Sequence, residues 1–156
     1  MTHQFFTPPG LIRMIRLGFV LAGGLLLSHT ALAEDTRQRA TLPPAAQESL
    51  RQEMLDNLLA INEILTLMAA DKIKEAGEVA EQKLGISAQG KNRSLPFEAR
   101  PGPHMPPDMH ALGMDGHKTA TEFAKAASTG ERSRALALLP NLTGACVACH
   151  YSWRTR

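Results

Sequence analysis

The chain has 156 residues, of which 17 are lysine or arginine and 15 are aspartate or glutamate. This length suits a single domain with one core and makes two domains hard to fit. Two arginines near the N-terminus, Arg13 and Arg16, account for the whole formal charge of +2, so the remainder of the chain is neutral. A neutral chain without a basic stripe gives no indication of nucleic-acid binding.

Residues 1–33 have the pattern of a secretory signal peptide. Arg13 and Arg16 precede a short apolar run over residues 17–27, and small residues follow it. The run is shorter than the roughly 20 residues that a membrane-spanning helix needs, so we expect no stable membrane insertion after cleavage. Because the arginines are not adjacent, the general export route is favoured over the twin-arginine route.

Ala31 and Ala33 form a small-x-small processing site, which predicts cleavage between Ala33 and Glu34. The mature domain then comprises residues 34–156 and lies outside the cytoplasm. Its first ten residues, 34–43, are polar, and we expect them to be loose.

A long amphipathic helix is predicted over residues 45–70, after Pro43 and Pro44. Its apolar residues recur at steps of four and three, which predicts a core-facing stripe. The members of this stripe are Met54, Leu58, Ile61, Leu65 and Met68. A shorter amphipathic helix is predicted over residues 73–84, with Gly85 as its C-cap.

Residues 86–107 contain five prolines and predict a long crossover loop, either a binding feature or, slightly favoured, a linker. A third helix is predicted over residues 108–130 with Asp108 as its N-cap. A fourth is predicted over residues 131–153, with a kink or brief break at Pro140. Four helical patterns without alternating strand segments predict an all-α protein, an antiparallel four-helix bundle.

The only two cysteines belong to the pentapeptide Cys146-Val147-Ala148-Cys149-His150. Cys-x-x-Cys-His is typical of c-type haem attachment, in which the two thiols bind the haem vinyl groups and the histidine ligates the iron. Spacings of three and four residues place Cys146, Cys149 and His150 on one side of a helix. We therefore expect one covalent haem c near the C-terminus.

The motif has three alternative interpretations. A thioredoxin-like dithiol would need a strand and helix unit, and a zinc site would need two further ligands at suitable spacing. A disulfide between Cys146 and Cys149 is compatible with an oxidising compartment but does not explain His150. The export signal favours haem attachment over all three.

A signal peptide, four helices and a Cys-x-x-Cys-His motif at the extreme C-terminus, followed by Tyr151-Ser152-Trp153-Arg154, resemble the class II c-type cytochromes. That family comprises cytochromes c′ and their low-spin, methionine-ligated relatives, which are periplasmic four-helix bundles. The resemblance implies that Arg154 lies beside the proximal haem face or pairs with a propionate, and that Trp153 packs against the haem edge. Arg51, near the start of the first helix, also fits the family pattern and is included among the haem-binding residues.

The sixth iron ligand decides function within this family. A methionine from the first helix gives a low-spin iron with a raised potential, suited to electron transfer. Met54 lies about where that methionine is expected, but a shift of one residue would place Leu55 over the iron and leave the site open. Ordinary core packing is the alternative role for Met54.

The resemblance thus implies a periplasmic monohaem cytochrome that carries single electrons, with His150 and Met54 as iron ligands. The alternative is a five-coordinate protein of the cytochrome c′ kind that binds nitric oxide or carbon monoxide. No constellation typical of an enzyme is present. A redox partner protein is implied but not identified, and family members are often dimers through the first helix. His104, His110 and His117 are expected to be solvated surface residues.

Overall fold

The computed structural model describes residues 34–156. The predicted signal peptide, residues 1–33, lies outside this range, and the predicted cleavage site lies at its first residue. Residues 37–156 form one compact unit. None of the helices in the described part combines the length and hydropathy that crossing a membrane requires.

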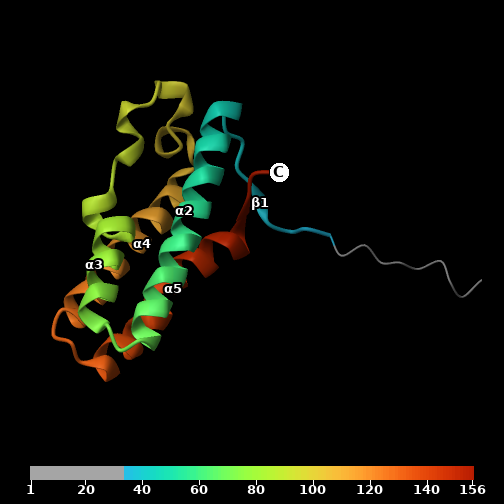
Figure 1. Ribbon diagram of the computed structural model, residues 1–156. Coiled ribbons are helices and arrows are strands. Elements are labelled where there is room, and N and C mark those ends of the chain that lie inside the picture. Colours follow the sequence, from blue (N-terminus) through green and yellow to red (C-terminus); the bar gives the residue numbers. More distant parts are fainter. Residues whose placement is uncertain (1–33) are drawn as a thin grey trace, which may run out of the picture. The chain divides into compact units, whose positions relative to one another are not determined.

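The described residues are mostly helical, which confirms the all-α prediction (Figure 1). The α-helices are α2 (Pro44–Ala69), α3 (Ile73–Leu84), α4 (Pro107–Ala127) and α5 (Arg132–Ser152). Two strands of two residues each, β1 (Gln38–Arg39) and β2 (Trp153–Arg154), flank them in the sequence. Along the chain, each helix packs against the next, α2 on α3, α3 on α4 and α4 on α5.

The helix boundaries agree with the sequence prediction to within a few residues, with one error of assignment. Asp108 is not the N-cap of α4, because the helix begins one residue earlier, at Pro107, with Pro106 as N-cap. Proline suits the first helical position, where its missing N–H has no partner to lose. Asp108 therefore lies within the first turn, where its carboxylate faces the positive end of the helix dipole.

Two proline-dependent predictions have different outcomes. The fourth helix is not broken at Pro140, since α5 is helical on both sides of that residue, whereas the alternative of a kink stays a prediction. The proline-rich loop does lack a continuous α-helix, as expected. It consists of four short 3-10 helices, η1 (Ile86–Ala88), η2 (Lys91–Ser94), η3 (Phe97–Ala99) and η4 (Gly102–His104).

The buried face of α2 matches the predicted stripe only in part, because Met68 is buried and Ile61 packs against the core. Met54, Leu58 and Leu65 are 37%, 66% and 48% exposed, so they do not lie in the core. The buried side chains of α2 are Ala46, Leu50, Ala60, Ile64 and Met68. Small side chains such as alanine let the neighbouring helix approach closely, so the helix is rotated toward its alanine-containing face, away from the leucine-rich one.

The segment before α2 is ordered, in contrast to the expectation for residues 34–43. Gln38 pairs with Trp153 and Arg39 with Arg154 in a parallel two-stranded ladder. Ala40 and Leu42 are buried. These two apolar residues alternate with polar ones, which is the period of a strand.

The main core contains side chains from all four helices. Its buried members are Ile64, Met68, Ile73, Ala76, Ala80, Ala120, Phe123, Ala127, Ala135 and Leu142. Gly77 marks the closest approach of α3 to α4, because a Cβ at this position would lie 2.8 Å from Cβ of Ala127 and 3.1 Å from the carbonyl oxygen of Ala124.

We predict that Gly77→Ala lowers the free energy of unfolding by about 1–3 kcal/mol, because the added methyl group overpacks the contact between α3 and α4. Gly144→Ala is the matched control, since no atom lies within 4 Å of the position that its methyl group would take on α5. That control should raise stability by about 0.5–1 kcal/mol. Urea denaturation measures both, and equal effects would contradict the close approach.

A polar network joins the end of α3 to α4. The Thr121 hydroxyl donates to Oε2 of Glu81 at 2.6 Å and accepts from the backbone N–H of Ile86 at 2.9 Å. The N–H of Ser87 donates to Oε1 of Glu81 at 3.1 Å. These bonds, the Thr121 bond foremost, lower the pKa of Glu81 despite partial desolvation.

We predict that Thr121→Val lowers the free energy of unfolding at pH 7 by about 1 kcal/mol through the lost hydrogen bonds. A lowered carboxyl pKa stabilises the fold above the unfolded-state pKa, and this stability is lost as pH falls through the folded-state value. The variant should therefore lose less stability than wild type on acidification from pH 5 to lower values. Thr66→Val, which removes only a bond within α2, is the control, and identical acid titrations of Thr121→Val and wild type would contradict the network.

Candidate functional site

The Cys-x-x-Cys-His motif occupies the last turns of α5, immediately before β2. Both cysteines are free thiols, Cys146 exposed and Cys149 half-buried. His150 is exposed. Cys146 precedes Cys149 by three residues and His150 by four, so the helical backbone places the three side chains on adjoining parts of one side of α5.

The pKa values of both thiols are raised above their ordinary value. Burial is the main cause at each position, because desolvation penalises the thiolate. At Cys149 the neighbouring Cys146 raises the pKa further, since two thiolates would repel each other. Both groups are therefore protonated thiols at neutral pH.

A second apolar cluster, here called the motif-end cluster, surrounds Cys149. Its buried members come from the N-terminal segment, α2 and α4, namely Ala40, Leu42, Ala46, Leu50 and Met109. The half-buried side chains of Met105, Cys149 and Trp153 pack against it. Trp153 thus contacts a protein cluster beside the motif, a role the sequence did not indicate.

The main core and the motif-end cluster are separate, and exposed side chains lie between them on α2 and α5. On α2, Met54 lies between Leu50 of the motif-end cluster and Ile64 of the main core, and it is exposed. On α5, exposed Cys146 lies between Leu142 and Cys149. The burial of apolar side chains is therefore interrupted between the two clusters on these helices, beside the start of the motif.

α4 differs at this level. Gly113 lies between Met109 of the motif-end cluster and Ala120 of the main core, but it is exposed, so the empty space beside it is solvent. At Gly116 a Cβ would lie 3.5 Å from Cβ of Ala145, so α4 and α5 are in contact between the two clusters.

Arg154 and Arg51 lie at the same end of the molecule as the motif. Arg154 is half-buried in β2, and its guanidinium donates to the carbonyl oxygen of Arg156 at 2.7 Å. Arg51 is exposed and donates through Nε to Glu48 at 2.9 Å. The same contact lowers the pKa of the Glu48 carboxyl and raises that of Arg51. Both arginines are thus placed on the motif side, and their haem contacts stay predictions.

The three histidines that lie outside the motif within residues 34–156 do not share one environment. His110 is exposed, as expected. His117 is half-buried and donates through Nδ1 to the carbonyl oxygen of Leu84 at 2.7 Å, so the expectation of a solvated histidine is wrong there. His104 is also half-buried, donates to the carbonyl oxygen of Phe97 at 3.1 Å and lies edge-to-face with that ring. A histidine side chain can donate a hydrogen bond to a carbonyl group at the end of a helix. The expectation of solvated histidines did not take such contacts into account.

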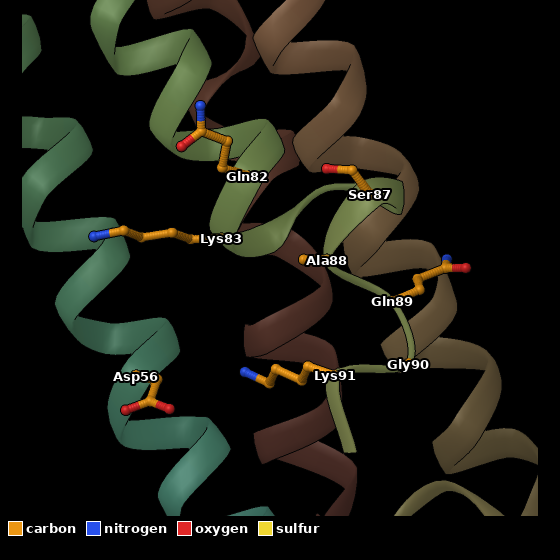
Figure 2. Close-up of a pocket in the computed structure, with 8 residues that line it drawn as sticks. All are labelled: Asp56, Gln82, Lys83, Ser87, Ala88, Gln89, Gly90 and Lys91. Atoms are coloured by element: carbon orange, nitrogen blue, oxygen red, sulfur yellow. The ribbon is translucent and has the colours of Figure 1, made fainter. Parts of the chain in front are cut away.

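Two surface pockets are lined by residues outside the motif. One, of about 480 Å³, lies beside Asp56 of α2, the end of α3 and the residues up to Lys91. Figure 2 shows that Lys83 and Lys91 extend toward the side of α2 that carries Asp56. Both lysines already pair with α2 glutamates, Lys83 with Glu63 and Lys91 with Glu53 at 3.7 Å. This pocket is therefore a polar surface depression between α2, the end of α3 and the segment that follows α3.

The other pocket, of about 260 Å³, is lined by residues of the chain ends and the start of α2, including Arg39, Gln47 and Arg156. Within residues 34–156 no group of three or more His, Cys, Asp or Glu side chains is arranged to hold a metal ion.

Comparisons with protein-family models, with curated proteins and with solved structures found no match for this chain. The functional argument therefore rests on the motif and its surroundings.

Proposed function

We propose that the protein is a periplasmic monohaem c-type cytochrome that carries single electrons. The observation that supports this most is the position of the Cys-x-x-Cys-His motif on α5, beside the interruption between the two apolar clusters. A large apolar ring needs such an interruption, since a continuously packed core has no space for it.

The residues present fit a covalently held haem. Cys146 and Cys149 are protonated and free, and each thiol would add across one vinyl group, forming an S–C bond while hydrogen goes to the neighbouring carbon. His150 follows directly and supplies the imidazole that ligates iron. The haem would supply the one-electron change between ferric and ferrous iron, and no substrate chemistry is required of the chain.

The arrangement of helices supports the proposed antiparallel four-helix bundle. Short connections join α2 to α3 and α4 to α5, and in each case the two joined helices pack against each other. In such a bundle the N-terminal part of α2 and the C-terminal part of α5 lie at the same end, which agrees with Leu50 and Cys149 sharing one cluster. Cofactor sites of bundles are built from side chains on facing helices in this way.

Met54 is the proposed sixth ligand. It follows Leu50 by one helical turn on α2, and Leu50 belongs to the cluster that Cys149 contacts. Its side chain lies on the flank of the buried face, 37% exposed, and is therefore not committed to packing in the core. Methionine and histidine ligation favours the reduced iron and raises the reduction potential.

The side chains around the ligands would then set the haem environment. Trp153 packs beside Cys149, and Arg154 and Arg51 lie on the motif side, where guanidinium groups can pair with propionates. A protein electron donor or acceptor is the implied partner. Export as a mature chain of residues 34–156, and pairing of two copies, belong to the same proposal.

We predict that Cys146→Ser combined with Cys149→Ser abolishes haem retention through acid-acetone extraction, because only the thioether bonds resist that treatment. Each single variant should keep one bond and retain haem in part. Thr143→Ser, one turn before Cys146 on α5, is the control and should retain haem as wild type does. Full retention by the double variant would disprove covalent attachment.

We predict that Met54→Ala converts a low-spin iron to high spin, removes the methionine-to-iron absorption band and lowers the reduction potential. Met114→Ala on α4 is the control and should leave the ferric and ferrous spectra unchanged. If Met54→Ala also leaves them unchanged, Met54 is not the ligand. A wild-type protein that is high-spin and shifts its spectrum with nitric oxide would indicate the gas-binding function instead.

A further inference from the structure

The residues before α2 and those after the motif are bonded to each other by main-chain and side-chain contacts. β1 pairs in parallel with β2, and the N–H of Ala40 extends the ladder by donating to the carbonyl oxygen of Arg154 at 2.8 Å. Gln47, in the first turns of α2, donates through Nε2 to the carbonyl oxygen of Thr155 at 2.8 Å. Segments more than a hundred residues apart in sequence thus hold each other, as β1 and the C-terminus in Figure 1 show.

The same N-terminal segment contacts the motif itself. The Arg37 guanidinium donates to the carbonyl oxygen of His150 at 3.4 Å, at the end of α5 where carbonyl groups lack helical partners. Ala40 and Leu42 are buried in the motif-end cluster, against which Cys149 and Trp153 pack. Residues 37–42, here called the strap, therefore contact the C-terminal region in three ways. They bond to the last turn of α5, they pair with β2, and they bury two side chains in the motif-end cluster.

A helix end frays readily unless other contacts hold it. The last turn of α5 carries Cys149 and His150 and is followed directly by β2. Within the described chain, the strap and the start of α2 donate hydrogen bonds to the carbonyl groups of His150, Arg154 and Thr155. The strap is therefore placed to hold the last turn of α5, which carries part of the motif.

We propose that the strap is a positioning element that holds the motif-bearing end of α5, so that Cys149 and His150 are kept in the geometry required for haem attachment and ligation. The effect of the strap on haem attachment and ligation rests on the proposed function, whereas its hold on the end of α5 does not. The two parts can therefore fail separately.

The test is hydrogen exchange of the full mature chain, with and without haem, compared between wild type and Ala40→Pro. Proline removes the N–H that bonds Arg154, so amides of residues 149–154 should exchange at least about fivefold faster, with α3 amides unchanged. In the same variant the fraction of protein with covalent haem should fall. Unchanged exchange over residues 149–154 would overturn the proposal.

Arg132→Gln is the matched control, because it breaks the ion pair with Asp71 at the opposite end of the same helix. It should leave exchange over residues 149–154 and the haem yield unchanged. If Ala40→Pro unfolds the whole chain, Arg37→Ala serves instead, since it removes the strap's guanidinium donor to the carbonyl oxygen of His150 and should likewise speed exchange over residues 149–154. Faster exchange in a protein that never carries haem would support the strap and contradict the cytochrome proposal.

Discussion

The rest of the structure depends on how the four helices divide their apolar side chains between two separate clusters. Alanines and Gly77 bring α3 and α4 into close contact, and Phe123 fills the centre of the main core. Between that cluster and the motif-end cluster, Met54 of α2 and Cys146 of α5 are exposed, so the burial of apolar side chains is interrupted there. Few aromatic residues are available, at 4% of the sequence, so a bound macrocycle would contribute a large part of the missing apolar contact.

This division explains why the motif is both accessible and held. Cys146 lies between the two clusters and is exposed, whereas Cys149 packs against the motif-end cluster and takes its position from α2, α4 and the strap. The strap connects the N-terminal segment to the residues at and after His150, so the helix that carries the proposed iron ligand is constrained at its last turn. Accessible thiols on a fixed backbone are what an attachment reaction needs.

Sequence reasoning located the helices because their periodicity and their Gly and Pro boundaries are local properties. It placed Met54, Leu58 and Leu65 in the core because periodicity gives the width of an apolar face but not which of two apolar faces meets the neighbour. Burial of Ile64 and Ala60 depends on the approach of α3, which is tertiary. The motif was readable because its chemistry requires fixed spacing. The strap and the His117 contact with Leu84 join residues far apart in sequence, and only the alternation of Ala40 and Leu42 hinted at the former.

The intact mass of the exported protein tests the central claim most directly. The account predicts the mass of residues 34–156 plus one haem, retained under denaturing conditions, because two thioether bonds join Cys146 and Cys149 to the ring. A mass equal to the bare polypeptide, or to the polypeptide less two hydrogens from a disulfide, would contradict it.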